Sequence, residues 1–347
     1  MKNTMLLSAL AALAAEPESG AAQSGIVYSA NESLLEAALK RGAAQGANDG
    51  NVDGFHLSEP LTQFITTVPD PENLQALLDS LFPNVPTGMR FSYAQWDESS
   101  AFQKDSMGEI TRPVGGEFAV VSQRATEAEG RCYNKGLTIY VDNDQGGMLP
   151  QVQQQHVASL RNRILRSELA QGVALIDAAA GEEGSTNWGS STSNPDGDVR
   201  TSLKNAGDLR GIESNVVLFG QGSWNNRCAA YEQAGRTNGG MKADYTPERL
   251  AQLLGVDRVV NLKTRYRTSA TALAGIIGST VYNYYAQFGA TTTDPSNVKR
   301  FTMNTPSGQM RVFIEQQTSR VKITVDMYSN IIVTSTVGIR KRTVTYS

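Results

Sequence analysis

QVQQQHVASLRNRILRSELAQGVALIDAAA, residues 151–180, is the longest helical pattern in the sequence. Its apolar residues recur mostly at spacings of three or four, which is the period of one helix face. These residues are Val157, Leu160, Ile164, Leu169, Val173 and Ile176. Pro150 suits the first turn of a helix, and Gly181 suits the position after its end. Because an α-helix rises ~1.5 Å per residue, about 30 residues give a strut of ~45 Å.

Only one stripe of this predicted helix is apolar, since its charged residues fall largely off the stripe. They are Arg161, Arg163, Arg166 and Glu168. A helix of this kind buries its stripe against a neighbouring layer and exposes the rest. We therefore expect it to lie on a sheet, with these four residues away from the buried face.

Extended patterns precede the helix. Residues 89–97 (MRFSYAQWD), 117–123 (EFAVVSQ) and 137–142 (LTIYVD) are predicted as strands. The polar stretch 98–116 between them has few apolar residues, and compact domains seldom keep a connection that long without a function. As a projecting hairpin with arms of roughly 10 residues, it would reach ~30 Å beyond the body. Such a hairpin would have to rest on something else.

The chain before these strands holds a short helix and an arm. Asp70 is predicted to cap the helix, with Pro71 at its first position; Leu74, Leu77, Leu78 and Leu81 follow at helical spacing, before Pro83 and Pro86. Residues 16–56 are rich in Ala, Gly, Ser and Asn and contain one weak helical stretch, 32–41. They are predicted to form an extended arm with little core of its own.

An α/β pattern follows the long helix. After a polar break at 181–198 we expect a strand at 215–219 and a helix with Trp224, Cys228 and Tyr231 on one face. A second helix is capped by Thr246, has Leu250, Leu253 and Leu254 inward and ends at Gly255, directly before a strand at 256–262. Period-two patterns at 310–314, 321–327 and 331–339 predict three consecutive strands in a closing antiparallel sheet.

Residues 1–15 (MKNTMLLSALAALAA) allow two interpretations. They fit a secretory signal with a cleavage site at Ala12-Leu13-Ala14, and they equally fit an Ala/Leu-rich helix at the end of the arm. No other stretch approaches the ~20 apolar residues of a membrane span, so we expect no membrane partner.

Composition narrows the function classes. The 347 residues include 40% hydrophobic and 19% charged residues, which excludes a disordered chain, and the length predicts roughly two domains. The net charge of −3 lacks the basic excess of a protein that grips nucleic acid over its whole surface. Residues 1–80 hold three Lys/Arg and ten Asp/Glu, whereas residues 299–347 hold eight and two. Either these are solvated faces, or an acidic arm crosses a basic face on a neighbouring copy.

Signatures of catalysis are missing. The sequence has no phosphate-binding glycine motif, nucleophile elbow, H-E-x-x-H or C-x-x-C. His56 and His156 lie 100 residues apart, so they do not form a catalytic or metal-binding pair in the sequence. Cys132 and Cys228 have neither metal-ligand spacing nor a disulfide framework, which favours a reducing compartment. A single disulfide between them remains an alternative. We expect Cys132 to be partly exposed and Cys228 to be a buried apolar residue. The acidic pairs Asp142/Asp144 and Glu182/Glu183 are predicted as solvated turns, and Trp188 as a loop anchor. We predict no catalytic, cofactor-binding or metal-binding residue, and no enzyme.

The order of elements resembles the major capsid protein of tailed bacteriophages, the HK-ninety-seven-like fold that encapsulin shells also use. The resemblance rests on diffuse patterns from about residue 60 onward: GGEFAVVSQ and GLTIYVDND leading into the long helix, NVVLFGQGSWNNRCAAYEQ, YTPERLAQLLGVDRVVNL, and the closing VKITVDMYSNIIVTSTVGIRKRTVTYS. It implies an α+β fold. The implied parts are an N-terminal arm (1–60), a helix and connection (61–88), an extended E-loop hairpin (89–142), a peripheral domain with the spine helix (143–205), an axial α/β domain (206–320) and C-terminal strands (321–347).

The resemblance implies a structural role. Many copies would assemble as hexamers and pentamers into an icosahedral shell around double-stranded DNA, with portal and scaffolding or decoration proteins as further partners. The resemblance also implies assembly in the host cytoplasm and a final location in the virion capsid. For residues 1–15 this favours the helix at the end of the arm over a secretory signal. Lys104 falls in the loop, but no partner Asn or catalytic acid is identified, so covalent cross-linking is not carried over.

Three alternatives remain open. One is an encapsulin-like compartment with cargo enzymes inside, which is a close variant of the capsid interpretation. Another is a secreted or periplasmic binding protein that uses Trp188 and Trp224 around a cleft. The third is a hydrolase with an unrecognised site.

Overall fold

The computed structural model describes residues 55–68, 70, 72–96, 111–112, 114–118, 125–190, 192–233, 243–267, 271–287, 289–304 and 308–347. The chain divides into two units, residues 1–56 and residues 57–347. Strand β1 (Phe55–Leu57) lies at their boundary, and everything below concerns the second unit. The predictions for residues 1–54, for most of the stretch 98–116 and for Lys104 lie outside the described residues.

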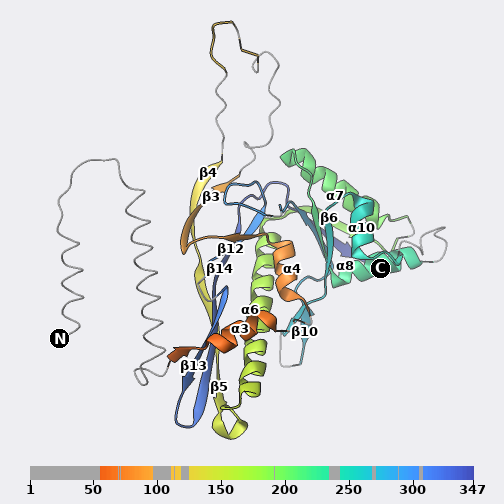
Figure 1. Cartoon of the computed structure of the whole chain (residues 1–347). Helices are drawn as coiled ribbons and strands as arrows, with labels where there is room; N and C mark the ends of the chain where they lie inside the picture. The colour runs from red at the N-terminus through yellow and green to blue at the C-terminus, as the bar shows by residue number, and fades with distance from the viewer. Residues whose placement is uncertain are drawn as a thin grey trace. The chain divides into compact units, whose positions relative to one another are not determined.

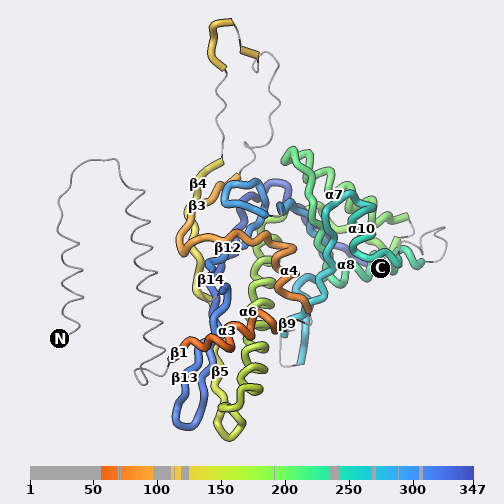
Figure 2. The backbone as a smooth tube through the Cα atoms, viewed as in Figure 1, coloured from red at the N-terminus to blue at the C-terminus, as the bar shows by residue number. Residues whose placement is uncertain are grey.

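The larger sheet is organised around β14 (Arg320–Val333), which pairs antiparallel with three strands. β5 (Tyr133–Asp142) runs along one side, whereas β13 (Met310–Gln316) and β12 (Val298–Thr302) share the other. β2 (Asn84–Pro86) joins β12 in parallel. Figure 2 traces β13 and β14 as one hairpin. A separate third strand at 331–339 is wrong, because Ile331 and Val333 continue β14.

Helix α6 (Pro150–Ala179) has 30 residues and packs along β14 and β5 (Figure 1), as predicted. The six apolar residues of its predicted stripe are all buried. The expectation for Arg161 and Glu168 is wrong, because only 8% and 1% of these residues are exposed. Arg161 pairs with Asp70 at 3.7 Å, and Glu168 has the cationic partners described below; these contacts compensate the burial of both residues.

Two short helices, α3 (Glu59–Thr67) and α4 (Leu74–Leu81), pack against α6. Leu74, Leu78 and Leu81 are buried in the same core as the stripe of α6. α4 begins at Leu74, later than predicted, because Asn73 before it adopts a left-handed conformation with φ 51°. Asp70 still acts as a cap, since its carboxylate accepts from the backbone N–H groups of Glu72 and Gln75 at 3.2 Å.

The smaller sheet has the order β6-β15-β11-β7-β8 and mixed direction. Its strands are β6 (Gly181–Asn187), β7 (Val216–Gly220), β8 (Arg258–Leu262), β11 (Thr280–Tyr284) and β15 (Arg340–Thr345). Helices α7 (Pro195–Arg210), α8 (Gln221–Glu232) and α10 (Pro247–Leu254) pack on it. The predicted antiparallel pairing of 310–314 with 321–327 is confirmed in the larger sheet. The last strand, β15, lies in the smaller sheet instead, antiparallel to β11 and parallel to β6.

Sheet membership differs from the parts that the resemblance implied. The break predicted at 181–198 contains β6 and the start of α7. Helix α7 spans the expected boundary at 205/206, and both β6 and α7 belong with the smaller sheet. β12 and β13, expected in the axial domain, pair in the larger sheet. The division into a peripheral and an axial domain stays a prediction.

Local signals of α10 are confirmed. Thr246 caps it by accepting from the N–H of Arg249, and Gly255 ends it at φ 73°. Leu250 is buried, but Leu253 is exposed, contrary to prediction. The buried face of α8 also differs: it contains Arg227 and Tyr231, whereas Trp224 and Cys228 are only half-buried.

Two antiparallel ribbons stand apart from both sheets. β3 (Arg90–Gln95) pairs with β4 (Thr126–Arg131), and β9 (Arg265–Arg267) pairs with β10 (Leu273–Gly275). The strand predicted at 117–123 is wrong at 117 and 118, which are not extended into a strand; residues 119–123 lie outside the described residues. Residues 137–142 belong to β5 of the larger sheet and not to a ribbon.

Candidate interaction surfaces and their support

The β3–β4 ribbon is attached to the body through an aromatic cluster. The Phe91 ring stacks on Phe301 of β12 with centroids 4.2 Å apart, and Tyr93 lies 5.7 Å from the same ring. Val85 and Cys132 complete this small core, which is separate from the main one. Offset aromatic pairs at such distances stabilise by about 0.5–1.5 kcal/mol beyond their burial. The packing of β3 on β12 therefore fixes the direction in which the ribbon leaves the body.

The outer face of the same ribbon carries charges of both signs. Ser92 and Ala94 are opposite Glu129 and Glu127, and both glutamates are exposed. Successive residues of a strand point to opposite faces, so these four side chains share the face away from Phe301 with the exposed pair Arg90 and Arg131. Small side chains beside two carboxylates and two guanidinium groups offer a platform for a surface of mixed charge.

Large apolar side chains are exposed between β3 and β4 in the sequence, in the turn before α6, and on the β9–β10 ribbon. Val114 is fully exposed and Phe118 is 67% exposed; both lie between β3 and β4 in the sequence. Met148 and Leu149 are exposed in the turn before α6, and so are Tyr266 and Leu273 on the β9–β10 ribbon. Single exposed apolar residues are ordinary, but grouped ones mark contact surfaces.

The β9–β10 ribbon and the segment just before β9 are basic. Lys263, Arg265 and Arg267 are all exposed, with Tyr266 between the two arginines. The β9–β10 ribbon is thus a basic patch, whereas the outer face of β3–β4 has two carboxylates and two guanidinium groups. A basic patch favours the rate and orientation of association with an acidic surface.

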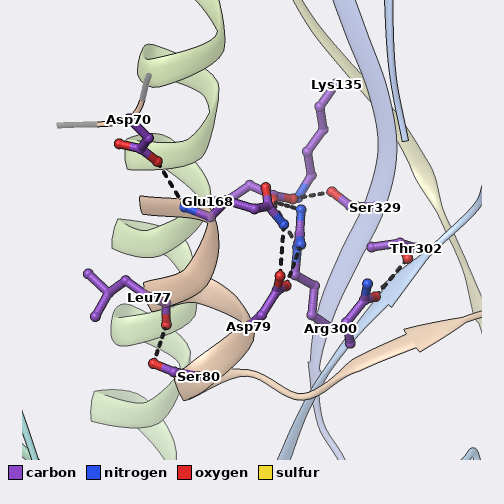
Figure 3. Close-up of polar contacts among 11 residues, drawn as sticks. Asp70, Leu77, Asp79, Ser80, Lys135, Glu168, Arg300, Thr302 and Ser329 are labelled. Atoms are coloured by element: carbon purple, nitrogen blue, oxygen red, sulfur yellow. Dashed lines mark hydrogen bonds and ion pairs between the residues drawn. The ribbon is translucent and has the colours of Figure 1, made fainter. Parts of the chain in front are cut away.

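A buried charge cluster supports the long helix (Figure 3). Glu168 of α6 accepts a hydrogen bond from Arg300 Nε of β12 at 3.0 Å, with the guanidinium Nη2 at ion-pair distance (2.9 Å), and a second hydrogen bond from Lys135 of β5 at 3.0 Å. The hydroxyl of Ser329 on β14 also donates to Glu168. Arg300 reaches Asp79 of α4 at 3.2 Å. The cluster thus connects five elements that are far apart in the sequence.

The cluster is charge-balanced, since two cations face two carboxylates, and its centre is deeply buried, whereas Asp79 and Lys135 lie nearer the surface. The side chains of Arg300 and Glu168 are 0% and 1% exposed. A buried ion pair is weak evidence for stability as a whole, but removing one partner leaves an uncompensated charge in the interior. The cluster therefore fixes where α6 lies on β12, β14 and β5, because any slip of the helix would separate these groups.

The charged partners also set the protonation of Glu168. Burial alone would raise the pKa of its carboxyl, but Arg300 and Lys135 outweigh burial and, with the Ser329 hydroxyl, hold the pKa below the ordinary value of 4.5. A lowered pKa in the folded state gives stability that is present at neutral pH and is lost as pH falls below 4.5.

We therefore expect the difference in unfolding free energy between the unmodified protein and Glu168→Gln to depend on pH. The difference should be constant near neutral pH and should shrink as pH falls below 4.5, because the folded state then binds the proton less readily than the unfolded state. Urea unfolding of both proteins across this range measures it. A difference that stays flat, or grows in acid, would contradict the assignment.

The residues singled out in the sequence are dispersed. His56 is exposed and His156 is half-buried on α6. Cys132 is 1% exposed, so the expected partial exposure is wrong; its thiol lies under the ribbon beside Thr87, and burial raises its pKa. Cys228 is half-buried rather than buried, and burial is also the main cause of its raised pKa. Within the described residues, no group of three or more His, Cys, Asp or Glu side chains could hold a metal ion.

The acidic pairs and the tryptophans also have definite partners. Glu183 is not a solvated turn residue, since it lies in β6 and pairs with Arg342 at 3.0 Å; Glu182 pairs with Lys341 at 3.3 Å. Asp142 accepts from the N–H of Asp144 at 2.9 Å, which is a turn contact as predicted. The remaining residues of interest are aromatic: Trp188 is buried and donates to Asp198 at 2.8 Å, whereas Trp224 borders an open hollow with Tyr245, Asn261 and Lys263.

Trp188 is absent from the lining of that hollow, so the structure does not support a cleft shared by the two tryptophans. Among the helices that the structure describes, none is both long enough and apolar enough to span a bilayer. The distinctive features of the described residues are the exposed ribbons and apolar side chains, and the buried charge cluster around Glu168.

Comparisons with known proteins agree with this architecture. No family model and no curated protein matches the sequence. The chain is similar to the crystal structure of a phage-related protein from Bordetella bronchiseptica RB50, with a TM-score of 0.59, 14% identity, and coverage of 83% of this chain and 96% of that chain.

Two further structures show weaker likeness. The putative capsid protein of a prophage of E. coli CFT073 gives a TM-score of 0.46 at 11% identity, covering 84% of this chain and 99% of that one. The capsid of Cyanophage P-SCSP1u gives 0.47 at 10% identity, covering 76% and 86%. The α+β class is confirmed, and the chain shares the fold of the Bordetella phage-related protein.

Proposed function

We propose that copies of this chain assemble into a closed icosahedral shell, as the major capsid protein of a tailed phage. The fold supports this proposal through its likeness to a phage-related protein. The observation that carries it is the exposure of Val114 and Phe118 in a chain whose two sheets already bury an apolar core without them. Apolar side chains of this kind gain burial only when a second copy covers them.

The partners proposed are further copies of the chain, as hexamers and pentamers, with portal and scaffolding or decoration proteins. The enclosed cargo is double-stranded DNA, held without specific contacts, because a net charge of −3 disfavours tight phosphate binding over the whole surface. We place assembly in the host cytoplasm and the product in the virion capsid, and we propose no catalytic role. An encapsulin-like shell would differ in holding enzymes instead of DNA.

Substitution of the exposed loop residue tests the contact between copies. Phe118→Ser should leave the unfolding free energy of the subunit within about 0.5 kcal/mol, because this side chain is exposed in the single chain. It should weaken assembly, since burying a Phe side chain contributes about 1.5–3 kcal/mol, or roughly 10- to 150-fold per contact. Sedimentation velocity at several protein concentrations measures both populations.

Leu209→Ser is the matched control, because Leu209 is an exposed apolar residue on α7, 44% exposed, outside the loop. It should assemble like the unmodified protein. Equal assembly of Phe118→Ser and Leu209→Ser would remove the loop from the proposed contact.

A further inference from the structure

The two sheets are connected by three chain crossings in the described part of the chain. α6 leads into β6 at residues 179–181, β11 leads into β12 through residues 285–297, and β14 leads into β15 through residues 334–339. The two sheets also share the main apolar core, which contains Leu218 and Tyr282 of the smaller sheet as well as Val312 and Ile323 of the larger one. Apolar packing is non-directional, so the hydrogen bonds among these crossings supply the directional contacts between the sheets.

Asn297 stands where two of the crossings meet, and it is 0% exposed. Its side-chain oxygen accepts from the N–H of Tyr285 at 2.8 Å and from the guanidinium of Arg210 at the end of α7. Its amide nitrogen donates to the carbonyls of Ser335 at 2.9 Å and Val337 at 2.8 Å. A neutral amide offers two donors and two acceptor sites, so every polar position of this side chain is used.

The backbone of Asn297 makes the same connections. Its N–H donates to the carbonyl of Tyr285 at 2.9 Å, and its carbonyl accepts from the N–H groups of Thr334 at 2.8 Å and Ser335 at 3.2 Å. One residue at the start of β12 therefore holds the end of β11, the segment after β14, and the end of α7. Serine or leucine could not replace it, because neither supplies both donors and acceptors in this geometry.

The groups around Asn297 are themselves fixed. Arg210 lies over the ring of Tyr285 at 5.0 Å, and burial lowers its pKa to about 10, so it remains charged at neutral pH. Lys299, 0% exposed, pairs with Asp294 at 3.0 Å and donates to the carbonyl of Thr291 at 2.9 Å. The segment 291–297 is therefore held from both ends.

The β3–β4 ribbon rests on the same two crossings. The N–H of Ala94 donates to the carbonyl of Thr292 at 3.0 Å, and the N–H of Trp96 donates to the carbonyl of Thr334 at 2.9 Å. A change in how the crossings meet would move the ribbon together with the sheets. The ribbon direction and the angle between the sheets are thus coupled through one hydrogen-bonded junction.

We infer that Asn297 is a positioning residue that fixes the angle between the two sheets and, with it, the direction of the β3–β4 ribbon. The consequence for assembly rests on the proposed function: in a shell, this angle sets the geometry at which copies meet and therefore the curvature of the particle. The junction acts within one chain, so its effect can be measured without any assembly.

The test compares two buried asparagines by distances between spin labels. Ser167→Cys on α6 and Gln252→Cys on α10 are both exposed and report on the two layers, in a Cys228→Ala background that leaves only buried Cys132. Labelled protein is diluted with unlabelled protein, so that only distances within one chain are recorded. Asn297→Ala should broaden or shift this distance distribution relative to the protein with Asn297.

Asn283→Ala is the matched control. Asn283 is 1% exposed, and its side chain bonds to Ser202 of α7 within the layer of the smaller sheet, at 2.8 and 3.3 Å. It should lower the melting temperature while leaving the distance distribution unchanged. If Asn297→Ala gives the same distribution as the control, the inference is wrong and Asn297 contributes stability only.

A second variant covers the case in which Asn297→Ala does not fold. Asn297→Asp keeps the acceptor contacts with Tyr285 and Arg210 but places a carboxylate oxygen against the carbonyls of Ser335 and Val337. It should loosen only the crossing at 334–339 and also broaden the distance distribution; an unchanged distribution contradicts the inference.

Electron microscopy of the assembled protein, with and without the Asn297 substitutions, then measures the particle diameter. If the unmodified protein never assembles, the proposed function is refuted while the distance result stands.

Discussion

Glu168→Ala is expected to lower the free energy of unfolding by about 3–5 kcal/mol, the range for removing one partner of a buried ion pair. The substitution leaves Arg300, 0% exposed, with only Asp79, and removes the anion nearest to Lys135. Chemical denaturation monitored by tryptophan fluorescence and by circular dichroism measures the loss. The effect is large because the stranded guanidinium can neither reach water nor give up its proton.

The control for this result is an exposed pair on the same helix. Arg166 of α6 pairs with Glu72, and these side chains are 42% and 38% exposed. Glu72→Ala should cost no more than about 0–1 kcal/mol, because solvent replaces the lost partner. If Glu168→Ala and Glu72→Ala cost the same, the buried cluster does not hold the helix on the sheet.

Phe82→Ala is the second large effect, with an expected loss of about 3–5 kcal/mol. Phe82 is 0% exposed, follows the end of α4, and lies against Gly172 of α6. A Cβ at position 172 would lie 2.4 Å from the Phe82 ring, so the two helices approach this closely only because residue 172 is glycine. Truncating the ring leaves a cavity at the helix contact that the rigid strut cannot close.

A double-mutant cycle isolates this contact. Gly172→Ala alone should destabilise, because overpacking costs about 1–3 kcal/mol and exceeds the gain of roughly 1 kcal/mol in helix propensity. In the Phe82→Ala background the added methyl finds space, so the same substitution should become stabilising. Four melting or urea curves measure the coupling, and additive effects would show that the ring and the glycine do not meet.

Local patterns predicted the elements whose signals are contained within one segment. α6 and α10 carry their own apolar spacing and their own terminal residues, so their bounds were predicted to within a residue or two. β7 is wholly buried and apolar, and its prediction also held. These segments need no knowledge of a partner to be recognised.

Strands that depend on a partner were missed. β4 has the sequence TEAEGR and β6 has GEEGSTN, and neither alternates apolar with polar residues. β4 is a strand because it pairs with β3, whose aromatic face packs on Phe301; β6 is one because it pairs with β15 and because Glu183 meets Arg342. Such pairings join residues far apart in the sequence, so no local pattern contains them.

The burial of Glu168 could have been predicted from its position in the sequence. It follows Ile164 by four residues and precedes Gly172 by four, so it falls on the buried stripe of α6. A charged residue at core spacing requires a buried partner. The identity of that partner could not be predicted, because Arg300 is 132 residues away and reaches Glu168 only through the pairing of β12 with β14.

Electron microscopy of the purified full chain, without partners, tests the central proposal most directly. We expect closed shells, or tubes and rings built from the same contacts, in which residues 114–118 of one copy lie against a neighbouring copy. A sample that stays monomeric across salt and protein concentration, or particles in which Phe118 remains exposed to solvent, would contradict the account.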